Sequence, residues 1–178
     1  LVKQEDALIW RGPMASSAIM QMINQCDFGE LDYLFIDFPP GTGDIPLSLM
    51  QKVPLTSAVL VSTAQQLAQD DVARAIKMLE KMKVSICGII NNMAYYTCGQ
   101  CTHQHYFMPK ETMCDFCESQ NIPYLGALPL SHTILNPEAA SSAICGTSPL
   151  DQNAIEIAKI ATKIAGNLAQ KPKEYRHL

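Results

Sequence analysis

A turn rich in glycine and proline, placed directly after an apolar run, is the feature that most constrains this chain. The segment from Leu31 to Ile45 reads LDYLFIDFPPGTGDI. Its apolar stretch, residues 33–36, is typical of a strand buried on both faces of a parallel sheet. Proline cannot donate ladder hydrogen bonds, so the strand is expected to end close to Asp37. The pattern therefore predicts a carboxylate at the carboxyl end of a buried strand.

Ligands bind at that edge in open α/β sheets. An aspartate there can hold Mg²⁺, and the N–H of a glycine such as Gly41 can face a terminal phosphate with no side chain in the way. The simpler interpretation makes Asp37 the cap of a strand-to-helix turn. A bare aspartate would leave both interpretations open, but the string DFPPGTGD is far more specific and favours the ligand site.

Strands alternate with helices along the rest of the chain, which predicts a doubly wound, mostly parallel α/β sheet flanked by helices. The expected strands are residues 33–36, 57–63, 84–90 and 122–128. The expected helices are residues 14–26, 45–52, 70–83 with Asp70 or Asp71 as cap, 137–144 and 149–169. Asp44 is a candidate cap for the second helix. Residues 1–170 are expected to form one domain, with a cysteine-rich loop at 94–117 and a frayed tail at 171–178.

Composition excludes several classes of protein. Among the 178 residues, 48% are hydrophobic and 17% are charged, with a net charge of −4, so no basic field for nucleic acid is present. The sequence contains no run of eighteen apolar residues, so no membrane span is predicted, and no signal peptide is visible. Seven cysteines, an odd number, favour a reducing cytoplasm with metal-binding or buried thiols over a disulfide framework.

Four of the cysteines lie between the third and fourth expected strands, as Cys98-x-x-Cys101 and Cys114-x-x-Cys117. A C-x-x-C pair on a loop can bind one metal centre. All four could bind one Zn²⁺, with His103 and His105 as spare ligands. Alternatively, Cys114 and Cys117 are not ligands and Cys117 is a core residue, since free cysteine is among the most buried residue types. The remaining three are expected in the core: Cys26, Cys87 and Cys145.

DFPPGTGD resembles the Walker B and switch II segment of the Mrp/ApbC family of iron–sulfur cluster carrier ATPases, within the MinD/ParA-like P-loop NTPases. WRGPM at residues 10–14, NNM at 91–93 and Cys98-x-x-Cys101 match the same family in the same order. Residues 111–120 resemble the helix that precedes the fourth strand in the family, which implies that Cys114 and Cys117 lie on one face of a helix. The usual Glu-Asn-Met is Asn-Asn-Met here, and Met108-Pro109-Lys110 replaces a glycine-rich segment. The string G-x-x-x-x-G-K-[ST] does not occur. We therefore expect this chain to be the C-terminal portion of the fold, without the N-terminal β-α units.

The resemblance implies site residues and cofactors. It places Asp37 on Mg²⁺ and water and Gly41 on the γ-phosphate, with Thr42 in the responding loop. It places Asn92 on the adenine of ATP, beside the loop that follows Pro129. The catalytic residues implied are Asp37 and Gly41.

The cysteines carry the second implication of the resemblance. Cys98 and Cys101 supply half of a four-ligand set, so a [4Fe–4S] cluster implies a homodimer in which each subunit gives both thiolates. The implied function is an ATP-dependent carrier that transfers its cluster to iron–sulfur apoproteins. Two alternatives remain: a non-catalytic, truncated metal-binding module, or a ParA/MinD-like partitioning ATPase with a structural zinc loop.

Overall fold

The computed structural model describes residues 12–39, 41, 43–131 and 152–170. The chain divides into two compact units, residues 1–55 with 175–178 and residues 56–174. The helix expected at 137–144, together with Cys145 and His132, lies outside the described residues. No helix within the described ranges is both long enough and apolar enough to cross a membrane.

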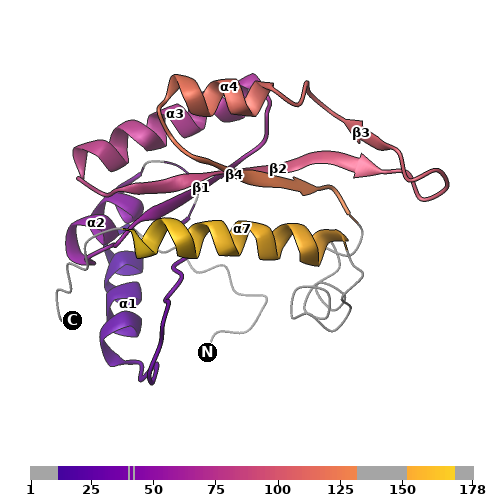
Figure 1. Ribbon diagram of the computed structural model, residues 1–178. Coiled ribbons are helices and arrows are strands. Elements are labelled where there is room, and N and C mark those ends of the chain that lie inside the picture. The colour runs from indigo at the N-terminus through magenta and orange to yellow at the C-terminus, as the bar shows by residue number, and fades with distance from the viewer. Residues whose placement is uncertain (1–11, 40, 42, 132–151, 171–178) are drawn as a thin grey trace, which may run out of the picture. The chain divides into compact units, whose positions relative to one another are not determined.

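The larger unit is built on one sheet of four strands: β1 (Ala58–Ser62), β2 (Ile86–Thr97), β3 (Gln104–Tyr106) and β4 (Tyr124–Pro129). Strands β1 and β4 both pair with β2 in parallel, whereas β3 pairs with the far end of β2 in antiparallel fashion. β2 is therefore the central strand, and its last residues extend beyond the parallel sheet as one arm of a hairpin (Figure 1).

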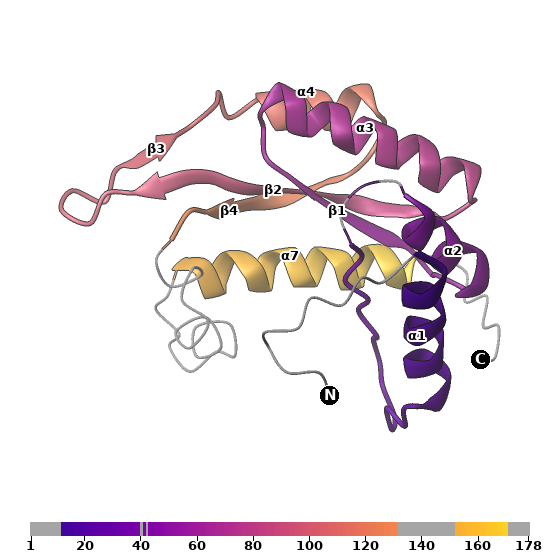
Figure 2. The same ribbon diagram turned by 180° about the vertical axis from the view of Figure 1, so that it is seen from behind.

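Helices cover both faces of this sheet. Helices α3 (Gln66–Lys81) and α4 (Thr112–Ser119) lie over one face, and α7 (Gln152–Ala169) lies over the other (Figures 1 and 2). The core on the α3 and α4 side contains Ile76, Ile89, Met113 and Cys117. On the opposite face α7 approaches closely, because a Cβ atom at Gly126 would lie 2.9 Å from Cγ1 of Ile160. This is the doubly wound arrangement that the alternating pattern predicts.

Three of the four predicted strands are confirmed as β1, β2 and β4. β2 is longer than expected and runs through residues 91–93 to Thr97. The predicted cap of α3 is wrong: the helix begins at Gln66, with Gln65 in the N-cap position, so Asp70 and Asp71 lie inside it. Leucine, alanine and glutamine at positions 66–69 form helix readily, so the first turn extends upstream of the two aspartates.

The smaller unit contains α1 (Gly12–Gln25) and α2 (Asp44–Lys52). The predicted strand at residues 33–36 is wrong, because the described residues between these helices adopt no regular structure. Phe35 is 72% exposed. A strand needs neighbours for its backbone N–H and C=O groups, and no strand in the described part of the chain pairs with this run. Gly43, with extended backbone, is the N-cap of α2, so Asp44 is its first helical residue and not its cap.

Candidate functional site

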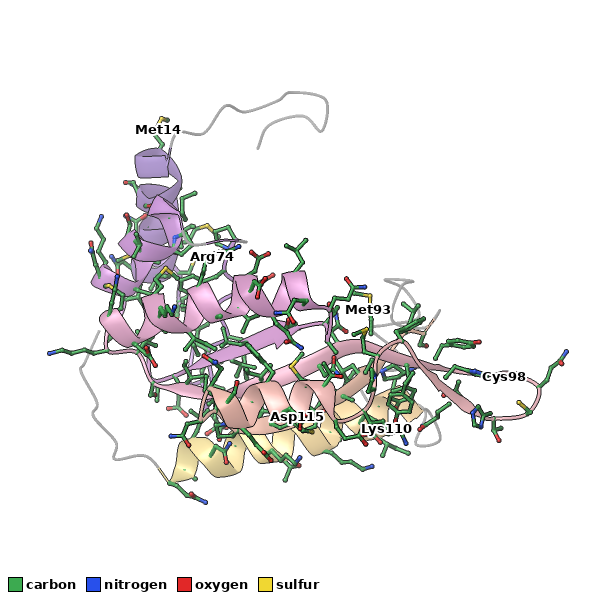
Figure 3. All side chains as sticks on the ribbon, turned by 90° about the horizontal axis from the view of Figure 1, so that it is seen from above. Met14, Arg74, Met93, Cys98, Lys110 and Asp115 are labelled. Carbon is green, nitrogen blue, oxygen red and sulfur yellow. The ribbon has the colours of Figure 1, made fainter. Side chains whose placement is uncertain are left out.

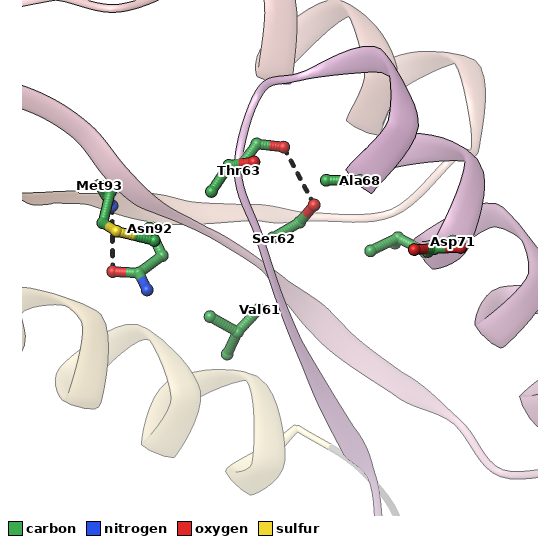
Figure 4. Close-up of a pocket in the computed structure, with 8 residues that line it drawn as sticks. Val61, Ser62, Thr63, Ala68, Asp71, Asn92 and Met93 are labelled. Atoms are coloured by element: carbon green, nitrogen blue, oxygen red, sulfur yellow. Dashed lines mark hydrogen bonds between the residues drawn. The ribbon is translucent and has the colours of Figure 1, made fainter. Parts of the chain in front are cut away.

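The carboxyl edge of the parallel strands holds a cavity of about 340 Å³. Ser62 and Thr63 contribute from the end of β1, Asp71 from α3, and Asn92 and Met93 from β2 (Figure 4). Because the strands are parallel, all of their carboxyl ends meet at this one edge. The sheet therefore brings together at this edge polar side chains that lie about thirty residues apart in the sequence.

An irregularity in β2 shapes this edge. Met93 has a left-handed backbone with φ of 51°, and the register between β2 and β4 shifts between Asn91 and Tyr95. The Met93 N–H donates to Oδ1 of Asn92 at 3.0 Å. This bond fixes the Asn92 side chain and leaves its amide nitrogen available as a donor (Figure 4).

A second cavity of about 210 Å³ lies next to the first, and Thr63 and Met93 line both. Phe107 and Leu130 are among the residues that complete its wall. Leu130 is held by its N–H, which donates to the carbonyl of Tyr95 at 2.7 Å. Two adjoining hollows with a methionine between them thus run along the carboxyl edge of the sheet.

The predicted nucleotide residues are distributed over both units. Asn92 and Pro129 lie on the neighbouring strands β2 and β4, and Pro129 is buried as the register partner of Tyr95. Asp37 lies in the smaller unit with an exposed side chain. Gly41, in the same unit, has φ of +89°, a conformation that favours glycine. Thr42 lies outside the described residues.

Cys98 and Cys101 occupy the tip of the hairpin that joins β2 to β3, away from the helices (Figure 3). The tip is closed by two backbone hydrogen bonds of 2.9 Å, from the Cys98 N–H to the carbonyl of His103 and from the Thr102 N–H to the carbonyl of Cys98. Cys101 is exposed and Cys98 is half-buried. Both thiols are therefore reachable from solvent on a short, closed loop.

The hairpin tip also stabilises a thiolate. Backbone N–H groups of Cys101 and Gln100 donate to the sulfur of Cys98, and the Cys101 side chain adds a third contact. These hydrogen bonds lower the pKa of the Cys98 thiol, because they favour its charged form. A loop whose amides converge on one sulfur provides what a metal–thiolate centre needs, since thiolate and not thiol is the metal ligand.

The second cysteine pair lies in a different environment. Cys114 and Cys117 are on α4, and Cys117 is only 2% exposed within the core, so its predicted core position is confirmed. Burial raises the pKa of the Cys117 thiol to about 11. Within the described ranges, no group of three or more histidine, cysteine, aspartate or glutamate side chains is arranged to hold a metal. The structure thus does not bring the four cysteines together, as one zinc ion would require.

The other cysteine predictions have mixed outcomes. Cys87 is buried as expected, but Cys26 is exposed, so its predicted core position is wrong. Cys26 directly follows the last residue of α1. The apolar pattern of that helix therefore ends before it.

Sequence reasoning missed the hairpin itself. Tyr96 lies opposite His105 in the antiparallel ladder, and their rings stack with centroids 4.8 Å apart. On the next register pair, Tyr95 and Tyr106 have centroids 5.0 Å apart, and the Nζ of Lys110 lies 4.5 Å from the centre of the Tyr106 ring. The signal was present, because aromatic residues flank a short loop that contains glycine, a typical hairpin pattern.

Comparison with known proteins gives a consistent result. The family model described as ParA, NUBPL iron-transfer P-loop NTPase, matches residues 1–165. The iron-sulfur cluster transfer protein NUBPL of Dictyostelium discoideum is 38% identical over 94% of this chain and 52% of its own length. The iron-sulfur cluster carrier protein of Haemophilus influenzae is 37% identical over 94% of this chain and 45% of its own length. The chain spans about half the length of these curated relatives.

Solved structures share the fold. The nucleotide-binding protein of Archaeoglobus fulgidus, in complex with ADP, has a TM-score of 0.60 at 27% identity, covering 93% of this chain and 59% of that one. The cell division ATPase MinD of Pyrococcus furiosus has a TM-score of 0.60 at 17% identity, covering 88% of this chain and 59% of that one, which shows the fold alone.

Proposed function

Because the chain belongs to the ParA family of P-loop NTPases, in the group described as NUBPL iron-transfer NTPases, we propose that it carries an iron–sulfur cluster. The cargo is a [4Fe–4S] cluster bound by Cys98 and Cys101 and passed to iron–sulfur apoproteins. The curated relatives at 37–38% identity are themselves named as cluster transfer and carrier proteins.

The observation that carries this proposal is the hairpin tip. Two thiols are held three residues apart on a closed loop, and the backbone amides of Cys101 and Gln100 lower the pKa of the Cys98 thiol. Hydrogen bonds to cluster sulfurs and exposure to solvent are the main means by which a protein tunes such a cluster. Exposed ligands also let an acceptor's thiolates reach the cluster, as transfer requires.

The ligand count supports a homodimer. A [4Fe–4S] cluster takes four thiolates, and the tip offers two. A two-fold axis through the cluster would bring Cys98 and Cys101 of each subunit to one centre, as the self-complementary interface of a symmetric dimer allows. The cluster would then be shared between two chains, and separation of the dimer would release it.

The nucleotide half of the proposal rests on the carboxyl edge of the sheet. The free amide nitrogen of Asn92 can donate to a ring acceptor of adenine, and the strand end at Pro129 lies on the neighbouring strand. Asp37, Gly41 and Thr42 would serve Mg²⁺ and the γ-phosphate. Bound Mg²⁺ would neutralise phosphate charge during ATP hydrolysis. ATP turnover would be coupled to cluster release through the dimer.

A second candidate is a metal-binding module that does not hydrolyse ATP. It is supported by the thiol pair at Cys98 and Cys101, which could bind a metal whether or not ATP is hydrolysed. A malachite-green assay for released phosphate separates the two candidates. Phosphate release that is lost in the Asp37→Ala variant would support the ATPase candidate. Cluster loading without phosphate release supports the module.

Cluster transfer tests the carrier function itself. The chain would be loaded with cluster under anaerobic conditions, separated from free iron and mixed with an apo-ferredoxin. We expect the ferredoxin to gain its cluster faster than from equal amounts of free iron and sulfide. Equal rates would mean that the chain only releases iron, which contradicts a carrier role.

A further inference from the structure

The hairpin carries two histidines that the proposed cluster site does not use. His103 precedes β3, and His105 lies within it, separated by Gln104. Residues two apart on a strand project from the same face. The two imidazole rings are accordingly neighbours, with centroids 4.8 Å apart and planes at 77°.

That spacing suits two ligands of one metal ion. With metal–nitrogen distances of about 2.0–2.1 Å, two imidazoles at adjacent coordination positions have centroids about 4.5–5.2 Å apart. The observed 4.8 Å falls inside this window. Both side chains are exposed, so rotation about their side-chain bonds can bring one nitrogen of each ring toward a common point.

The surroundings leave the ring nitrogens free. His105 stacks its face on Tyr96, with planes 10° apart, and stacking does not occupy the nitrogens at the ring edge. Among the described residues, neither imidazole has a hydrogen-bond partner. Lys110 contacts the ring of Tyr106, which projects from the opposite face of the hairpin. Its positive charge therefore lies on the opposite face of the hairpin from His105, which stacks on Tyr96.

We propose that His103 and His105 form a two-imidazole site for a first-row divalent transition metal, separate from the thiol pair at Cys98 and Cys101. Imidazole suits iron, nickel, copper and zinc, and affinity rises along the series from iron to copper. Water fills the remaining coordination positions. The use of this site to hold ferrous iron beside the cluster thiols rests on the proposed carrier function; the site itself does not.

Nickel binding tests the site in a chain without the thiols. NiCl₂ would be titrated calorimetrically into the untagged chain that carries Cys98→Ser and Cys101→Ser. We expect one Ni²⁺ per chain. His103→Ala and His105→Ala should each weaken binding by about tenfold or more, because each removes one arm of a chelate. His132→Ala should leave binding unchanged.

A register swap is the sharpest control. The variant with Gln104→His and His105→Gln keeps the number of histidines but places them on opposite faces of the strand. It should bind Ni²⁺ as weakly as His105→Ala, with an unchanged circular dichroism spectrum. Binding equal to the parent in the swapped chain, loss of binding in His132→Ala, or no Ni²⁺ binding by the parent would overturn the proposal.

The result is distinguishable from failure of the carrier function. If the chain with intact thiols forms no cluster but Ni²⁺ binding still requires His103 and His105, the carrier function is contradicted and the histidine site is supported. If the cluster forms on Cys98 and Cys101 but the His103 and His105 variants bind Ni²⁺ as tightly as the parent, the carrier function is supported and the histidine site is contradicted.

Discussion

The backbone N–H of Met93 donates to Oδ1 of its neighbour Asn92 at 3.0 Å, while Met93 itself holds a left-handed φ of 51°. A non-glycine residue in this conformation inside a strand is uncommon and costs free energy. The Met93 residue lines both cavities of the carboxyl edge. The irregular backbone thus places a flexible thioether at the predicted adenine site.

Glycine at this position should relieve the strain. We expect Met93→Gly to be more stable than Met93→Ala by about 1 kcal/mol, because both remove the side chain but only glycine adopts a positive φ freely. Urea unfolding of the two variants measures the difference. Equal stabilities, or a more stable alanine variant, would show that the left-handed backbone carries no strain.

The close approach of α7 to β4 predicts a steric effect at Gly126. Alanine there would place its Cβ 2.9 Å from Cγ1 of Ile160, so Gly126→Ala should lower the free energy of unfolding by about 1–3 kcal/mol. Thermal or urea unfolding measures the loss. In the Ile160→Ala background the same substitution should cost less, since the colliding atom is absent and only the strain of a side chain at φ of +157° remains.

A matched control lies on α7 itself. Nothing lies within 4 Å of a Cβ atom at Gly166, and glycine inside a helix is unfavourable. Gly166→Ala should therefore stabilise the chain by about 0.5–1 kcal/mol. Destabilisation by both alanine substitutions would argue against the packing of α7 described above.

The cysteines should differ in reactivity. At pH 8, iodoacetamide should modify Cys98 and Cys101 in the native chain long before Cys117, whose pKa of about 11 leaves about a hundredfold less thiolate than an ordinary thiol. Peptide mapping by mass spectrometry gives the order, and urea should abolish the difference. Modification of Cys117 as fast as Cys101 would contradict its place in the core.

Burial of the same thiol predicts a pH dependence of stability. The folded pKa of Cys117, about 11, lies above its ordinary value of 9.0. Its contribution to stability is therefore complete below about pH 9 and is lost as the pH rises toward 11, by at most about 3 kcal/mol. Urea unfolding between pH 8 and 11 measures the decline. The slope should be shallower in Cys117→Ala, and an identical slope would contradict the buried neutral thiol.

Much of the larger unit could be predicted from the sequence. The apolar runs around Leu60, Ile89 and Leu125 identify β1, β2 and β4, because buried parallel strands need continuous apolar stretches. Periodic apolar residues identify α3 and α7 in the same way. Asn92 lies within β2 and not at its end, but the parallel pairing with β1 stops at Asn91, so Asn92 still lies at the carboxyl edge of the parallel strands.

The differences have physical causes. The run at residues 33–36 has the composition of a buried strand, but composition does not supply the neighbours that a strand must pair with. The hairpin of β2 and β3 depends on pairs such as Tyr96 with His105, which a scan for apolar runs does not detect. The αL conformation of Met93 depends on the register of β2 against β4, which no local pattern encodes.

The most direct test of the central claim is anaerobic reconstitution with iron and sulfide, followed by the visible spectrum, the iron count and the mass of the assembly. We predict absorption at about 400 nm and about four irons per dimer. Both should be lost in the double variant Cys98→Ser and Cys101→Ser, and retained in the double variant Cys114→Ser and Cys117→Ser. An equal loss in the two double variants, or one zinc per monomer in place of iron, would contradict a cluster held at the hairpin tip.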